Sequence, residues 1–337
     1  MQPEPALRRS SWNASTRAEP RIMPQRRKND LGLAEESADV LSPDEKLAVE
    51  EHAPLRPLAV HEVIRREGVE ELSRPMSSLW WSGLTAGLSI GFSVVAQGTL
   101  YAFLPDEEWR PLAASPGYAV GFLIVILGRY QLFTEITLTA VLPVLAEPSR
   151  QALAALGRLW ATVLLANLAG TFLFAGALAT HAVLPEAQTR GIAEVAQHIA
   201  TFPAGAAFVR GIVAGWLVAT VVWLLPSAES ARIWIIALLT AMMPALDLSH
   251  VISGSVEVFY LQLRGELGII DGVVRLLLPL LAGNVIGGAA LFALLAHGQV
   301  HDEMEPDAPP RGQAASPEAA PPPARPARRP AKRRAAQ

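Results

Sequence analysis

The chain of 337 residues contains no cysteine, which excludes disulfide bonds and cysteine-ligated metal sites. Residues 79–297 contain no lysine and nine arginines, so they hold only nine of the chain's 28 basic residues. The first ten residues have no apolar run, so we expect no signal peptide. The sequence also has no phosphate-binding glycine loop, no cluster of metal-ligating side chains and no nucleophile paired with a base. We therefore expect neither an enzyme nor a cofactor or resident metal.

Apolar residues fill the stretch that is poor in charge. Mean hydropathy is +0.30 although 18% of the residues are charged, because 12 basic residues precede residue 79 and seven follow residue 297. A helix needs about 20 apolar residues to cross a bilayer core. We predict an all-α integral membrane protein with six transmembrane helices. The six apolar stretches are 79–103, 116–145, 155–181, 205–225, 231–260 and 273–297.

The remaining regions differ in composition. Residues 1–56 are rich in Pro, Arg, Glu and Ser, which predicts a disordered arm. Residues 57–76 place apolar side chains at helical spacing, which predicts an amphipathic surface helix, with a fully solvated helix as the alternative. A six-helix transmembrane domain would follow at 77–298. The Pro/Ala/Arg-rich residues 299–337 predict a disordered tail that is either solvated or touches anionic lipid, with no nucleic-acid partner.

Basic residues crowd both ends of the chain, and six crossings return it to the side from which it started. Because Lys and Arg near membrane spans favour the cytoplasmic side, we expect both termini to be cytoplasmic. The sequence thus predicts a multi-pass protein of the cell (inner) membrane.

Two of the apolar stretches are interrupted by polar residues. The second contains Arg129, Gln131 and Glu135, and the fifth contains Asp247 and His250. Each is long enough for two short helices around a non-helical break, so we predict that helices 2 and 5 are broken. Unpaired backbone costs several kcal/mol per group in hydrocarbon, so each break must pack in protein or line a polar cavity.

The first three spans resemble the last three. Asn167 and Asn284 occupy matching Asn-x-x-Gly patterns 117 residues apart, and Thr134 stands 116 residues before His250. Small residues recur one turn apart in the first and fourth spans, at Gly83, Gly87 and Gly91 and at Gly211 and Gly215. Three spans per half predict an inverted 3+3 repeat, which places a binding or conduction site near the midplane. The half-helix N-termini there favour an anion.

His250 is the only histidine in the interior of a predicted span rather than at its end, and intramembrane ionisable residues mark functional sites. Its imidazole could exchange a proton with a weak-acid anion, or it could be a structural histidine bonded to a carbonyl. The Thr134 hydroxyl could gate or solvate a pore. The Asn284 amide could contact substrate or tie the broken segments together. We predict His250, Thr134 and Asn284 as pore and substrate residues.

Further residues near the breaks form two groups. Apolar side chains could constrict a pore, or simply pack, at Leu132, Phe133, Phe202 and Leu248. Polar side chains could serve the outer mouth or the structure at Arg210, Asn167, Glu135 and Asp247. Arg210 in particular could attract anions at the outer mouth or snorkel to the interface.

Four segments, taken in order, resemble the formate/nitrite transporter family. They are Leu132-Phe133-Thr134-Glu135, Arg210-Gly211-Ile212, Asp247-Leu248-Ser249-His250 and Gly283-Asn284-Val285-Ile286-Gly287-Gly288, and the resemblance covers about residues 79–297. It implies an aquaporin-like protomer and a homopentamer with one pore per protomer. On this resemblance His250 is the central pore histidine, Thr134 the threonine after the first half-helix, and Asn284 the sixth-helix asparagine.

The chain departs from the family pattern at three positions. Members tend to have Glu before the histidine and Asn four residues after it, where this chain has Ser249 and Gly254. An Asn common in the fourth helix aligns with Gly215. These changes remove polar partners of His250, so the sequence is similar to a divergent subgroup.

The sequence therefore predicts a channel or transporter for a small monovalent anion of the formate, nitrite or hydrosulfide class, in which His250 shares a proton with the anion. Its partners would be the anion, a proton, membrane lipid and four further copies of the chain. Two alternatives stay open: a channel for a small neutral solute such as water or ammonia, and a non-conducting membrane scaffold or sensor that acts through its tails.

Overall fold

The computed structural model describes residues 42–45, 47, 53, 55–180 and 182–304, and these fall into two compact units divided after Pro54. In the first unit, residues 43–45 form a helical turn, and the Ser42 N–H donates to the Glu45 carboxylate at 2.8 Å. The predicted disordered arm and tail lie mostly outside the described residues. All elements discussed below belong to the second unit.

Every regular element that the described residues form is a helix, as predicted. The first group comprises α2 (Pro57–Ser73), α3 (Met76–Phe103), α4 (Arg110–Leu127), α5 (Ile136–Thr139), α6 (Val141–Ala146), α7 (Arg150–Ala179), α8 (Glu186–Ala200), α9 (Ala204–Leu224), α10 (Arg232–Ala245) and α11 (Val251–Leu263). Short 3-10 turns, η1 (Leu225–Ser227) and η2 (Glu229–Ala231), join α9 to α10. The chain then runs through α12 (Ile269–Asp271), η3 (Gly272–Leu277), α13 (Leu278–Val285), η4 (Ile286–Ala293) and α14 (Leu294–Met304), where η3 and η4 are π-helical. The helix thus continues past residue 298, the predicted boundary of the tail.

Five helices are long and apolar enough to cross a membrane: Met76–Phe103, Arg110–Leu127, Arg150–Ala179, Ala204–Ser227 and Ile269–His301. Two shorter apolar helices, Ile136–Ala146 and Val251–Leu263, follow the predicted breaks. The interruptions of the second and fifth apolar stretches are therefore confirmed, while the count of six crossings stays a prediction.

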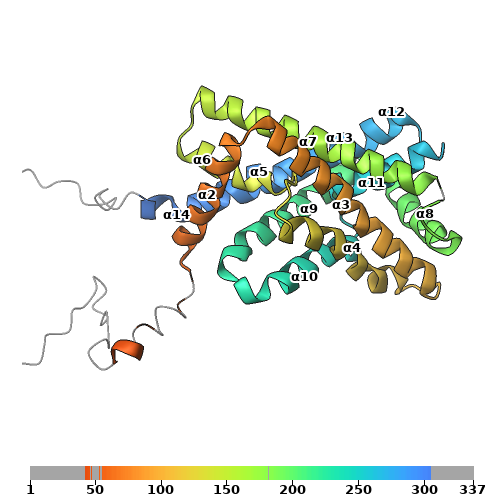
Figure 1. Cartoon of the computed structure of the whole chain (residues 1–337), viewed down its shortest axis with the longest axis horizontal. Helices are drawn as coiled ribbons and strands as arrows, with labels where there is room; N and C mark the ends of the chain where they lie inside the picture. Colours follow the sequence, from red (N-terminus) through yellow and green to blue (C-terminus); the bar gives the residue numbers. More distant parts are fainter. Residues whose placement is uncertain (1–41, 46, 48–52, 54, 181, 305–337) are drawn as a thin grey trace, which may run out of the picture. The chain divides into compact units, whose positions relative to one another are not determined.

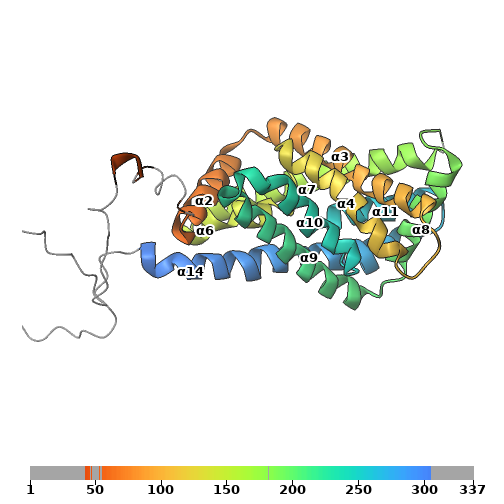
Figure 2. The same cartoon turned by 90° about the horizontal axis from the view of Figure 1, so that it is seen from below.

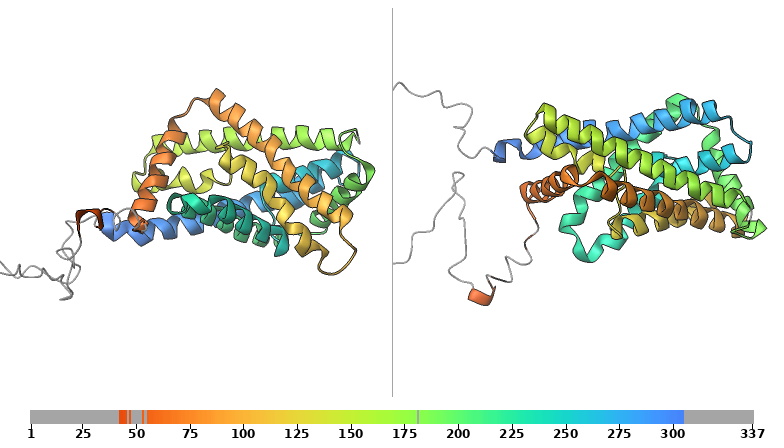
Figure 3. Two further views of the ribbon diagram at one scale, coloured as in Figure 1. Left: turned by 60° about the horizontal axis from the view of Figure 1, so that its bottom comes forward. Right: turned by 45° about the horizontal axis from the view of Figure 1, so that its top comes forward.

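The long helices run along the length of the second unit (Figure 3). Figure 1 shows α2, α6 and α14 at one end, called here the α2 end, and α8 and α12 at the opposite end, called the α8 end. Figure 2 shows the same separation from below. Helix α3 leads away from the α2 end and α9 leads back toward it, so the two halves of the chain run in opposite senses.

Helix α8 was not predicted, because its charged residues made the segment resemble a connection. Its apolar residues nevertheless follow the spacing of an amphipathic helix, and Ile192, Val195, Ala196 and Ile199 are all buried. This face packs against α3 and α11, so α8 forms one wall of the α8 end.

Helix α2 packs against the bundle through Val60 and Ile64, at the α2 end. Its predicted polar face is not wholly solvated, because the Glu71 carboxylate accepts hydrogen bonds from Thr139 Oγ1 at 2.5 Å and from Gln131 Nε2 at 3.3 Å. Burial raises the pKa of Glu71 to about 7, although these two hydrogen bonds lower it. Helix α2 is thereby fastened to the segment around the first break.

Candidate functional site

Both breaks begin with the same helix ending. The Tyr130 N–H donates to the Val125 carbonyl at 3.1 Å, and 118 residues later the Leu248 N–H donates to the Met243 carbonyl at 2.7 Å. Such six-residue closures are Schellman endings, which need one residue in the left-handed conformation. The internal repeat predicted from the sequence is thus visible in the backbone itself.

The left-handed residues are not glycine in either break. Arg129 has a φ of 54° and Asp247 a φ of 58°, a conformation that costs a residue with a Cβ about 1–2 kcal/mol. Each is held by an ion pair, because Arg129 lies 3.2 Å from Glu67 of α2 and Asp247 lies 2.7 Å from Arg210 of α9. The first break is thus paired with α2 through an arginine, and the second break is paired with α9 through an aspartate.

Asn167 ties down the first break. Its Oδ1 accepts the Phe133 N–H at 2.9 Å, and its Nδ2 donates to the carbonyls of Gly83 at 2.8 Å and Gln131 at 2.9 Å. The amide is fully buried, and its hydrogen bonds join α3, α7 and the break in one network.

Asn284 repeats this arrangement in the second half. Its Oδ1 accepts the Val251 N–H at 2.8 Å, and its Nδ2 donates to the carbonyls of Gly211 at 2.8 Å and Ser249 at 3.4 Å. Both amide hydrogens thus bind backbone, which is the tying role that the sequence left open. A contact between Asn284 and a permeating solute stays a prediction.

Close helix approach accounts for one departure from the family pattern. A Cβ on Gly215 would lie 2.3 Å from the carbonyl oxygen of Asn284, and a Cβ on Gly87 would lie 2.2 Å from that of Asn167. No side chain fits at either distance, so an asparagine at position 215 would require a different helix spacing. The predicted role of these small residues in helix packing agrees with this geometry.

Thr134 and His250 join the two breaks. Thr134 Oγ1 lies 2.6 Å from His250 Nε2, and both residues have no exposed surface. His250 also caps α11, because its Nδ1 accepts the Ser253 N–H at 3.2 Å. The Phe122 ring packs edge-on at a centroid distance of 5.0 Å. The imidazole is therefore fixed on three sides.

These contacts determine which nitrogen of His250 carries hydrogen. A neutral imidazole has one donor and one acceptor nitrogen. Because Nδ1 accepts the Ser253 amide, the hydrogen is on Nε2, which donates to Thr134 Oγ1. The hydroxyl hydrogen of Thr134 is then free to bind another acceptor.

A cavity of about 330 Å³ lies between His250 and the α8 end. Its walls come from α3, α4, α8, the end of α10, the second break and α11. The lining residues are Gln97, Tyr101, Pro111, Tyr118, Val195, His198, Ile199, Phe202, Pro244, Ala245, Asp247, Leu248, Ser249, His250, Gly254 and Glu257. A monovalent anion of a few atoms fits this volume.

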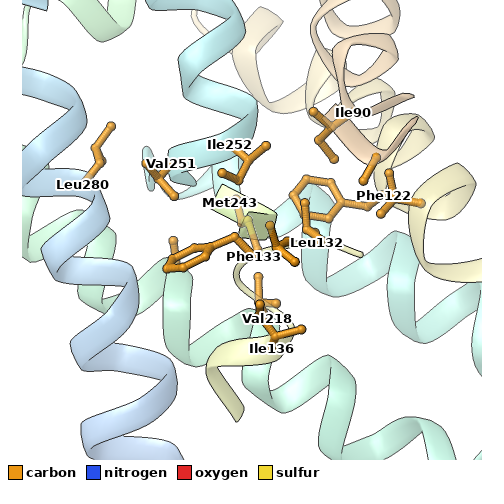
Figure 4. Close-up of a cluster of buried hydrophobic side chains, with 14 of the residues drawn as sticks. Ile90, Phe122, Leu132, Phe133, Ile136, Val218, Met243, Val251, Ile252 and Leu280 are labelled. Carbon is orange, nitrogen blue, oxygen red and sulfur yellow. The ribbon is translucent and has the colours of Figure 1, made fainter. Parts of the chain in front are cut away.

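The predicted constriction residues separate into two pairs. Phe202 and Leu248 line the cavity. Leu132 and Phe133 lie in the buried apolar cluster with Phe122 (Figure 4). Only the first pair therefore contacts the space that leads to His250 in this conformation.

Of the four polar residues predicted at the outer mouth or in the structure, two form an ion pair. Asp247 pairs with Arg210 and also lies 2.6 Å from His198 Nε2. The Arg210 guanidinium stacks on Phe202 at 4.0 Å from the ring centroid. Glu135 lies apart from this group, and its Oε1 is buried without a hydrogen-bond partner among the described residues.

The sequence did not single out Glu257 as a site residue. It lines the cavity and is 7% exposed. His250, Gly254 and Glu257 are spaced i, i+4 and i+7 on α11, which puts them on one helix face. This shared helix face could have been predicted from the sequence only if the start of α11 had been known.

Comparisons with known proteins agree with this geometry. The family model described as "Formate/nitrite transporter" matches residues 58–298. Inner membrane protein YfdC from Escherichia coli (strain K12) is 39% identical over 255 residues, which cover 76% of this chain and 82% of YfdC.

Solved structures share the fold. A pentameric formate channel with formate bound matches at a TM-score of 0.58 and 21% identity, covering 67% of this chain and 97% of that one. An FNT family ion channel matches at a TM-score of 0.61 and 22% identity, covering 72% of this chain and 98% of that one. The aquaporin-like helical architecture expected from the sequence is that of these channels.

Proposed function

The chain belongs to the formate/nitrite transporter family, and from this membership we propose that it is a membrane channel for small monovalent anions of the formate, nitrite or hydrosulfide class, with His250 as the proton-sharing group of the pore. The observation that carries the proposal is the 2.6 Å contact between His250 Nε2 and Thr134 Oγ1, which joins the two helix breaks.

In the proposed mechanism, the anion enters the cavity from the α8 end and reaches His250 past Phe202 and Leu248. It replaces Thr134 as the acceptor of the Nε2 hydrogen, and the released Thr134 hydroxyl donates a second hydrogen bond to it. Sharing the Nε2 hydrogen lowers the charge on the anion where apolar side chains surround it. A protonated Nδ1 would face the Ser253 N–H, so Nε2 is the nitrogen that shares its hydrogen with the anion, through a hydrogen bond in which the hydrogen stays on the ring.

The setting of the channel is part of the proposal. The inner membrane follows from the name of the 39% identical relative and from the apolar helices. A homopentamer follows from the description of one structural neighbour as pentameric. We infer that both termini are cytoplasmic, because they are rich in basic residues, and that the α8 end faces outward.

Flux into proteoliposomes tests the proposal. We expect uptake of formate, nitrite or hydrosulfide that increases as the external pH falls. We expect His250→Ala to reduce this uptake roughly tenfold or more, since proton transfer by a positioned group typically contributes at least that much. The matched control is His301→Ala, an exposed histidine on α14.

Each rival gives a different result in the same vesicles. If every anion flux is the same in His250→Ala as in the unchanged protein, the anion mechanism is wrong. Water or ammonia permeation without anion flux supports the neutral-solute channel. Absence of all flux, together with a cellular phenotype that depends on the tails alone, supports the scaffold.

A further inference from the structure

Glu257 is a carboxyl group inside the cavity that leads to His250. It is 7% exposed, lies on α11 within the predicted membrane domain, and has no hydrogen-bond or ion-pair partner among the described residues. Burial of an unpaired carboxylate is unfavourable, and such side chains within a membrane mark proton pathways. A purely structural role is a poor explanation, because Glu257 makes none of the bonds that such a role requires.

The α11 face between Glu257 and His250 lines the cavity along its length. Gly254 stands one turn from each, and a side chain there would meet Ile199 of α8, because even a Cβ would lie 3.0 Å from Ile199 Cδ1. The missing side chain leaves His250, Gly254 and Glu257 on a single wall of the same cavity. A small solute that moves along this wall meets the carboxyl of Glu257 before it meets the imidazole.

The cations near the cavity are already paired. Arg210 is bound to Asp247, Arg110 to Glu194 and Arg275 to Asp271. In addition, no arginine or lysine is among the residues that line the cavity with Glu257. The other titratable groups that face the cavity are Tyr101 of α3, Tyr118 of α4, His198 of α8, and Asp247 and His250 of the second break. No titratable group of α7 lines the cavity.

We propose that Glu257 is the proton donor of the cavity, which protonates a weak-acid anion on its way to His250. The proton passes from the Glu257 carboxylic acid to an oxygen or sulfur of the anion, leaving the carboxylate and the neutral acid. His250 Nε2 then donates its hydrogen bond to this neutral acid, where the proposed function alone has it donate to the anion. The carboxylate regains a proton from water at the α8 end. This inference rests on the proposed function and deepens it, because it predicts a substrate that is the anion of a weak acid rather than a strong-acid anion such as chloride.

Two measurements on the full-length protein test the assignment. The first is formate uptake into proteoliposomes across a series of external pH. We expect Glu257→Gln to lower uptake at least tenfold and to flatten its pH dependence, while Glu257→Asp restores a pH-dependent flux in part. The matched control is Glu194→Gln, a half-exposed carboxylate of α8 outside the cavity, which should leave the pH profile unchanged.

The second measurement is infrared difference spectroscopy of the reconstituted protein with and without formate. We expect a carbonyl band of a protonated carboxylic acid that decreases when formate is added, and that is missing in Glu257→Gln. This readout does not depend on transport. It also distinguishes loss of the proton donor from loss of folding, because the amide bands report the helices.

The outcomes separate this inference from the proposed function. Formate flux that is unchanged in Glu257→Gln refutes the proton donor and leaves the channel intact. No flux in the unchanged protein refutes the channel; a formate-sensitive carboxylic acid band would then still support Glu257 as the donor, and its absence would refute both. Chloride flux as fast as formate flux would also overturn the assignment.

Discussion

Asn284→Ala tests whether the breaks are held by asparagine ties. The substitution removes the bond from the Val251 N–H and the bond to the Gly211 carbonyl, each 2.8 Å long. A buried hydrogen bond contributes about 1 kcal/mol net, and a buried donor left without a partner costs about 1–3 kcal/mol more. The Val251 N–H is such a donor, since it lies in the first turn of α11. We expect a loss of about 2–4 kcal/mol in the free energy of unfolding.

Two further variants calibrate this value. Asn167→Ala removes the equivalent bonds of the first half, so we expect a similar loss. Thr220→Ala on α9 removes only a bond to the Trp216 carbonyl of its own helix, so we expect a loss below about 1 kcal/mol.

The assay is unfolding by titration with SDS in mixed detergent micelles, followed by circular dichroism. If Asn284→Ala were no less stable than Thr220→Ala, the hydrogen bonds of Asn284 would not stabilise the second break as proposed. A large loss for Asn284→Ala with none for Asn167→Ala would show instead that the two halves are not equivalent in energy, although they share the same contacts.

Three other features give predictions of their own. Burial raises the pKa of Glu71 from 4.5 to about 7, so docking of α2 is most stable below pH 4.5 and weakens as the pH rises through about 7. Hydrogen exchange in α2, corrected for intrinsic rates, should become faster over this pH range, and Glu71→Gln should remove the pH dependence. Gly215→Ala should be destabilised by several kcal/mol because its Cβ would overlap α13, whereas Gly205→Ala, with no neighbour within 4 Å, should not lose stability in the same SDS titration. Arg129→Gly relieves a left-handed arginine and should change stability by less than about 1 kcal/mol, while Asp247→Gly also breaks its pairs with α8 and α9 and should be less stable than Arg129→Gly.

The positions of the breaks could be predicted because polar residues in an apolar stretch have few explanations in a bilayer. The offset of 116 residues between Thr134 and His250 also anticipated that the two breaks correspond, and the structure brings these side chains into contact. Such features depend on composition and on repetition, which a single sequence displays directly.

The roles of individual polar side chains could not be read in the same way. The sequence left Asn284 between a pore contact and a tie, because the choice depends on which backbone groups lie beside it. Glu257 was not predicted as part of the site, because its alignment with His250 appears only once α11 begins at Val251. Helix α8 was missed for another reason, since its charges outweighed a short apolar stripe.

The cap on α11 affects whether protons can leak through the pore and dissipate the electrochemical gradient. With Nδ1 of His250 bound to the Ser253 amide, the ring cannot take up a proton on one side and release it on the other. A histidine open on both faces could act as a proton wire and dissipate the electrochemical gradient, in which each charge is worth about 2.3 kcal/mol per 100 mV. We expect a proton to cross only when a solute carries it. The cap on α11 would then also prevent proton leak through the pore.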